Sequence, residues 1–200
     1  MLVYDQIPLD RAGRLLAPHA IYWVRSLKTS IEEVWETVST KRGLEKWWLV
    51  PPKEFELKEG GRFCHHWNNV VTRFEPKRFI DFDESAGAYR GTGGMRFELA
   101  QTGPTETAFL FLATFGPRVL ASECLDGPPT KFDVQTAGPG TVWPAVAAGW
   151  HGMVDSLDRL FTSEAPSYSE QGLNEFYLAF LEDQFRLLDA VQRLPQEVPV

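Results

Sequence analysis

Cysteine is scarce in this 200-residue chain, which has only Cys64 and Cys124. Two thiols so far apart exclude the dense disulfide framework of small secreted domains and favour a reducing compartment. Long apolar runs are absent as well, since none approaches the roughly 20 residues that a transmembrane helix needs. The first six residues lack the basic and apolar regions of a secretion signal. We therefore expect a cytoplasmic protein without a membrane partner.

Positive charge is also in short supply, with 20 Lys and Arg against 27 Asp and Glu, for a net charge of −7. Such a chain has no basic excess with which to bind a phosphate backbone, and we expect no nucleic-acid partner. Cys64 and His66 share one face of a predicted strand, but they supply only two of the four ligands typical of zinc. Neither a nucleophile elbow nor a phosphate-binding loop occurs. We expect no metal, no cofactor and no catalytic constellation.

Aromatic side chains are abundant: 7 Trp, 5 Tyr and 14 Phe make up 13% of the chain. Each buries roughly 150–250 Å² when it is enclosed. A chain of this size can therefore fill a core with them and still line a cavity.

The first third of the chain predicts a strand followed by two short helices. Residues 19–25 are rich in β-formers. Ser30 and Glu33 form a capping box, which predicts a helix beginning at Ile31. A second short helix is predicted over residues 40–48, before the proline pair that starts at Pro51.

From Phe55 onward the apolar period changes from that of a helix to two, which is typical of antiparallel strands joined by tight turns. The predicted strands lie near residues 55–58, 62–67, 70–75, 79–83, 95–99 and 105–115. Residues 116–140 are rich in proline and glycine and are expected to form a long loop excursion. Two helices follow, predicted over residues 143–161 and 173–194. The order predicts an α+β fold in which a twisted antiparallel sheet is covered by a long helix.

Several short motifs occur in an order that is similar to one family. Gly43-Leu44-Glu45-Lys46-Trp47-Trp48 ends the helix pair, Gly60-Gly61 marks a hairpin, Val71–Phe79 holds a central proline, and Gly149-Trp150 lies in the long helix. Together they resemble the START-like (SRPBCC, helix-grip) superfamily, in the branch named after the activator of heat-shock protein 90 ATPase.

The resemblance covers residues 19–163 and implies a sheet wrapped around a long C-terminal helix. It leaves a lead-in of little structure at 1–18, and a linker with an added amphipathic helix at 164–200. That helix has an apolar stripe which would pack on its own domain, cover a cavity mouth or pair with a second chain, so a homodimer is one of the alternatives.

A cavity is expected between the sheet and the long helix. Its predicted lining is Trp47, Trp48, Phe63, His65, Trp67, Met95, Phe97, Phe109, Phe111, Trp143, Trp150 and Met153. Any of these residues could equally be plain core. His65, in phase with Phe63 and Trp67, would orient a ligand by one hydrogen bond or serve as a core histidine. One of the two adjacent tryptophans is expected in the core and the other at the rim of the cavity.

The resemblance and the aromatic surplus favour binding of a small or medium hydrophobic molecule. Members of the superfamily also act as cyclases or hydrolases on apolar substrates, and the name of the branch suggests a chaperone ATPase-activating partner. These two alternatives stay open from the sequence.

Overall fold

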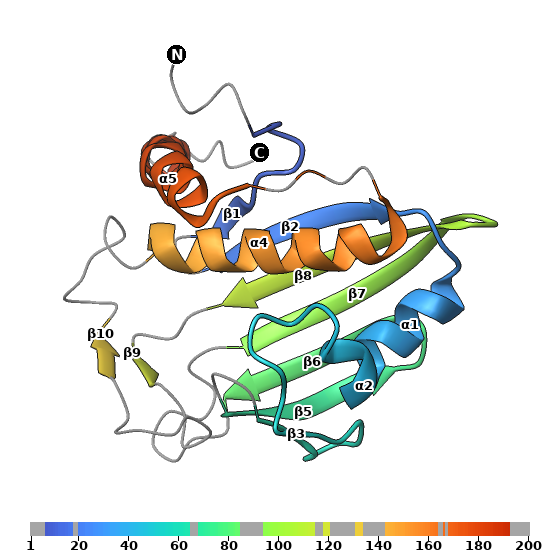
Figure 1. The fold of residues 1–200 in the computed structure, drawn as a ribbon. Helices are drawn as coiled ribbons and strands as arrows, with labels where there is room; N and C mark the ends of the chain where they lie inside the picture. Colours follow the sequence, from blue (N-terminus) through green and yellow to red (C-terminus); the bar gives the residue numbers. More distant parts are fainter. Residues whose placement is uncertain are drawn as a thin grey trace, which may run out of the picture.

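The computed structural model describes residues 7–17, 20–64, 68–84, 94–114, 118–120, 131–133, 143–163, 166 and 168–192. Eight strands form one antiparallel sheet in the order β1-β2-β8-β7-β6-β5-β4-β3 (Figure 1). Their bounds are β1 Arg14–Ala17, β2 Ala20–Leu27, β3 Glu54–Phe55, β4 Arg62–Cys64, β5 Asn68–Glu75, β6 Phe79–Glu84, β7 Gly94–Gly103 and β8 Glu106–Thr114. Strands that are consecutive in the chain are neighbours in the sheet, except that β2 lies beside β8 and not beside β3.

The alternation predicted for the strands is what the sheet shows. In β7, Met95, Phe97 and Leu99 are buried, whereas the residues between them are partly exposed. In β6, Ile80 and Phe82 are buried in the same way. All these side chains lie on one face because successive residues of a strand point to opposite sides. The apolar face of the sheet is therefore continuous across its central strands.

The first helix begins where the capping box places it. In α1 (Ile31–Ser39), the side chain of Ser30 accepts a hydrogen bond from the backbone N–H of Glu33 at 3.3 Å. The short α2 (Lys41–Leu44) is capped in the same way by Thr40, and it is shorter than the sequence predicted. This pair of helices lies beside the sheet, where α1 contacts β7 and β8 (Figure 1).

Two long helices complete the fold. The predicted helix over residues 143–161 is α4 (Trp143–Phe161), and it lies across the apolar face of the sheet. The added helix is α5 (Glu170–Gln192), which packs on α4 and β1 (Figure 1). The α+β fold predicted from the order of elements, and the helix-grip arrangement that the resemblance implies, are thereby confirmed. None of the helices among the described residues is long and apolar enough to cross a membrane.

Two stretches differ from their predicted structure. The lead-in was expected to have little structure of its own, yet it contains β1, which pairs with β2. Its Ile7 and Ala12 side chains are buried. Within the predicted loop excursion, β9 (Arg118–Leu120) and β10 (Lys131–Asp133) pair antiparallel, and the other residues of 116–140 lie outside the described part of the chain.

Candidate functional site

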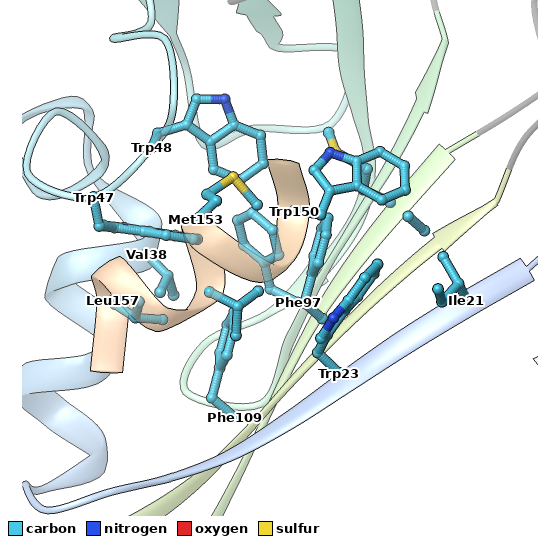
Figure 2. Packing of buried hydrophobic residues seen from close by; sticks show 14 of the residues in the cluster. Ile21, Trp23, Val38, Trp47, Trp48, Phe97, Phe109, Trp150, Met153 and Leu157 are labelled. Atoms are coloured by element: carbon cyan, nitrogen blue, oxygen red, sulfur yellow. The ribbon is translucent and has the colours of Figure 1, made fainter. Parts of the chain in front are cut away.

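An aromatic cluster fills the space between the sheet, α4 and the segment that follows α2 (Figure 2). Trp47 and Trp48 enter it from that segment, with their ring centroids 5.2 Å apart. The Trp48 ring lies 5.1 Å from Phe63 and 5.7 Å from Phe97, which come from two different strands. Three layers of the fold thus meet through rings in van der Waals contact.

On the α4 side, Trp150 closes the aromatic cluster. Its ring stands edge-on to Phe111 at 5.4 Å and to Trp23 at 5.9 Å. Met153, one turn further along the helix, is 2% exposed and points between the rings (Figure 2). A thioether on an unbranched chain adapts its shape more readily than an aromatic ring does. The helix side of the cluster is therefore its more adaptable wall.

Nine of the twelve predicted lining residues come together in this cluster. They are buried members of one core: Trp47, Trp48, Phe63, Met95, Phe97, Phe109, Phe111, Trp150 and Met153. Both adjacent tryptophans are buried, at 3% and 5% exposure, so neither forms an exposed rim. His65 and Trp67 lie outside the described residues, as does the side chain of Trp143. Their predicted roles stay predictions.

A second cluster, polar rather than aromatic, lies on the other side of α4. At its centre the Tyr177 hydroxyl accepts hydrogen bonds from the backbone N–H of Gly13 at 2.7 Å and from Trp23 Nε1 at 2.9 Å. The same oxygen lies 2.8 Å from Nδ1 of His151. Because two donors already occupy the oxygen, the phenolic hydrogen is the one left to bind Nδ1. This assigns His151 as the neutral tautomer that carries its proton on Nε2.

Two carboxylates and two guanidinium groups extend this polar cluster. Asp155 Oδ1 accepts from Arg25 Nε at 2.9 Å and from Arg11 Nη2 at 2.7 Å. Arg11 Nη2 also lies 2.7 Å from Asp158 Oδ2. Arg25, Asp155 and Asp158 are at most 3% exposed. Two positive and two negative charges thus balance one another, with only Arg11 partly exposed.

The His151 imidazole also approaches Asp155, with Nε2 at 3.1 Å from Oδ2. The two atoms are not aligned for a hydrogen bond, and each is buried without another partner among the described residues. Burial lowers the pKa of His151, the nearby carboxylate of Asp155 opposes this, and the charges of Arg25 and Arg11 lower it further. The net direction is down, so the neutral imidazole is the favoured form.

The pKa of Asp155 is shifted as well. Burial raises its pKa, but the imidazole of His151 and the charges of Arg25 and Arg11 outweigh burial and lower the pKa to about 2. The carboxylate is therefore ionised over the whole physiological range. Burial raises the pKa of Tyr177, so its hydroxyl keeps its hydrogen.

Trp23 joins the two clusters. Its indole stacks on Phe111 at 5.7 Å, while its Nε1 donates to Tyr177. Gly13 lies flat against the same indole, and a Cβ there would sit 2.4 Å from Trp23 Cε2. A glycine is therefore required to bring this backbone N–H to the Tyr177 hydroxyl.

Sequence reasoning missed the polar cluster. Its signal was present in β2, where Arg25 is in phase with the buried Ile21, Trp23 and Leu27. A second signal is the spacing of His151 and Asp155, one helical turn apart on a face of α4. The sequence favoured His65 because aromatic residues surround it in the chain, whereas the fold surrounds His151 with charges.

Cys64 also departs from expectation. It is buried and disulfide-bonded, a state that two cysteines so far apart did not predict. Cys124 lies outside the described residues. Among the residues that the structure describes, no group of three His, Cys, Asp or Glu side chains is arranged to hold a metal ion.

The family described as "Activator of Hsp90 ATPase homolog 1-like protein" matches residues 28–162, more than half of the chain. The chain belongs to this family. The match begins just after β2 and ends just after α4, so β1, β2 and α5 lie outside it. The polar cluster therefore joins the family core to its two flanking segments.

Solved structures agree on the fold. A conserved protein of unknown function from Enterococcus faecalis is 17% identical, with a TM-score of 0.59 over 86% of this chain and 91% of that one. CalU16 from Micromonospora echinospora is 15% identical, with a TM-score of 0.54 over 91% and 95% of the two chains. At these identities the likeness shows the fold alone. No curated protein matches the sequence.

Proposed function

We propose that this protein binds a small or medium-sized hydrophobic molecule between the sheet and α4. The observation that carries the proposal is the aromatic cluster, in which three layers of the fold direct rings into one space (Figure 2). Ligand sites in proteins are lined mainly by hydrophobic and aromatic side chains. The family's helix-grip fold, a sheet curved over a long helix, is consistent with such a site.

In the structure the rings contact one another, so a ligand would enter by displacing side chains. Met153 is the side chain best suited to move, because it is unbranched and has three rotatable bonds. Leu49, in the segment after Trp48, is 68% exposed and lies close to Gly149 of α4. We propose that a ligand enters the aromatic cluster between these two residues.

The polar cluster favours binding over catalysis as the proposed role. A histidine and two carboxylates are the groups that acid–base chemistry uses. Here His151, Asp155 and Asp158 face α5 and residues 7–17, across α4 from the aromatic cluster. A cytoplasmic location and a homodimer stay predictions from the sequence.

Titration with N-phenyl-1-naphthylamine, an uncharged apolar fluorophore, tests the proposal. We expect saturable one-to-one binding, with energy transfer from the tryptophans of the aromatic cluster. Met153→Trp fills the space and is expected to weaken binding at least tenfold. Leu178→Trp, on the exposed side of α5 at 56% exposure, introduces the same residue and should leave binding unchanged.

Met153→Ala makes the side chain smaller where Met153→Trp makes it larger. It keeps the test decisive if the larger variant does not fold. It opens space next to Trp150, so it should tighten binding of the probe. Binding that does not saturate, or that is equal in all three variants, would contradict the proposal. Native mass spectrometry of the purified protein would then show whether any molecule of a few hundred daltons is carried. A ligand-free protein that stimulates the ATPase of Hsp90 would favour the role named in the family description.

A further inference from the structure

We propose that residues 7–17 and α5 form a pH-sensitive latch on α4, which protonation of His151 opens. The proposal concerns the polar cluster and does not depend on ligand binding at the aromatic cluster. It rests on the way in which hydrogen-bond donors and acceptors are distributed around the Tyr177 hydroxyl.

That hydroxyl is fully used when His151 is neutral. It accepts from Gly13 N–H and from Trp23 Nε1–H, and it donates its own hydrogen to Nδ1 of His151. Tyr177 and His151 are both 0% exposed, so water does not reach this group to replace a lost partner. The arrangement joins four segments at one oxygen: the lead-in, β2, α4 and α5.

Protonation of His151 places a hydrogen on Nδ1, 2.8 Å from that oxygen. An imidazolium has no acceptor, so the phenolic hydrogen loses its partner while a third donor points at the oxygen. A buried polar group left without a partner is costly. The conflict is relieved when Tyr177 moves away, and it then releases Gly13.

The charges around His151 act in opposite directions: Asp155 Oδ2, 3.1 Å from Nε2, favours its protonation, whereas Arg25 and Arg11 oppose it. Arg11 approaches from the lead-in and Arg25 from β2, while Asp155 and Asp158 lie on α4 itself. These four charges already cancel, so an imidazolium would add one unbalanced buried charge. From the side of α5, the neutral rings of Tyr168 and Tyr177 stand edge-on to the imidazole at 5.6 Å and 5.7 Å.

The direction of the pH effect follows. Burial lowers the pKa of His151 below its ordinary value of 6.5. The docked state then binds fewer protons than the open state, so docking is fully stable above about pH 6.5 and weakens as the pH falls below it.

A second contact between the lead-in and α5 lies beside the Tyr177 hydroxyl, and we expect it to break when Tyr177 releases Gly13. Leu15 N–H donates to Gln184 Oε1 at 2.7 Å, and Gln184 Nε2 donates back to Gly13 O at 3.4 Å. The amide hydrogens of Gly13 and Leu15 therefore report on the latch. Amides of the central strands β7 and β8 serve as an internal reference, since they exchange only when the sheet itself opens.

The test is amide hydrogen exchange by NMR on the full chain between pH 7.5 and 5.0. Protection factors of Gly13 and Leu15 are expected to fall at least tenfold over this range, while those of β7 and β8 stay constant. In His151→Asn the side-chain oxygen takes the place of Nδ1 and cannot be protonated in this range. The fall should therefore disappear in this variant.

Gly13→Ala serves as the undocked standard, because its Cβ would collide with Trp23 and it changes no titratable group. It should show low protection at residue 15 at every pH. If His151→Asn does not fold, the imidazole C–H signals of the wild type give the second measurement, and their titration midpoint must coincide with the loss of protection. Constant protection in the wild type, an equal fall in His151→Asn, or midpoints that differ would each overturn the proposal.

Discussion

The two buried faces of α4 differ in the kind of contact that they make: one packs through apolar side chains and the other through hydrogen bonds and ion pairs. Toward the sheet, Trp150, Met153 and Leu157 pack among rings and aliphatic chains, with no direction imposed on any contact. On the other face, His151 bonds to Tyr177 of α5 and Asp155 bonds to Arg25 of β2, so these contacts are directional hydrogen bonds between polar atoms. One helix therefore has a face that tolerates changes of shape and a face that tolerates few changes of chemistry. The comparison predicts that substitutions of equal size will have unequal effects.

The largest effect is expected for Asp155→Asn, which keeps the size of the side chain and removes its charge. Arg25 and Arg11 would then lack their shared carboxylate in a buried site. Removing one partner of a buried ion pair costs about 3–5 kcal/mol. Urea unfolding at pH 7 measures the loss in the free energy of unfolding. Glu182→Gln, in an exposed ion pair with Arg186, is the control and should cause no measurable change. A loss below 1 kcal/mol in Asp155→Asn would remove the contrast between the two faces.

On the apolar face, a substitution of equal size should be mild. Met153→Leu is expected to cost less than about 1.5 kcal/mol, because volume-conserving swaps repack. Met153→Ala is expected to cost about 2–5 kcal/mol through lost burial and the cavity left behind. The same urea unfolding experiment compares the two variants. Equal losses for Leu and Ala would show that this face is as demanding in its chemistry as the other.

A smaller effect is expected for Tyr177→Phe, which removes one oxygen and leaves the ring. The Gly13 N–H and Trp23 Nε1–H would both lose their acceptor. The expected cost is about 1–3 kcal/mol. Tyr22→Phe, on the opposite face of β2 from Trp23, is the matched control. If both variants unfold at the same urea concentration, the hydroxyl of Tyr177 contributes nothing to docking.

The last prediction concerns acid and has no effect at neutral pH. The pKa of Asp155 is lowered from its ordinary 3.8 to about 2, so its contribution to stability is complete above pH 4 and is lost as the pH falls toward 2. Unfolding measured from pH 5 to pH 2 should show this loss in the wild type. In Asp155→Asn, the free energy of unfolding should fall less steeply with decreasing pH, because the contribution of Asp155 is absent. An identical slope in both proteins would assign the acid sensitivity to other carboxylates.

The fold was readable from the sequence wherever one face of an element meets water. The alternation of Phe97 with Glu98 predicted β7, and the capping pair Ser30 and Glu33 located the start of α1 to the residue. The stripe of Val154 and Leu157 gave α4 in the same way. These signals are local, because they depend on the period of one element and not on what it contacts.

The polar cluster could not be read in this way because it depends on contacts between distant parts of the chain. Arg11 and Asp155 are 144 residues apart, and Gly13 and Tyr177 are 164 residues apart. The lead-in was expected to have little structure because its own sequence has no clear period. In the structure, β1 pairs with β2 and bonds to α5 through Leu15 and Gln184. Nine of the twelve predicted lining residues come together in one region, and their predicted role as a ligand lining stays a proposal.

The bond from Leu15 N–H to Gln184 has one more consequence. β1 is the terminal strand of the sheet, and a strand in that position presents backbone donors that can pair with a strand from another molecule. The Gln184 amide occupies one of these donors, and α5 lies over the strand. A chain shortened to the family core after residue 162 would keep β1 and lose this cover. Such a fragment would be open to aggregation through its sheet edge, against which α5 protects the 200-residue chain.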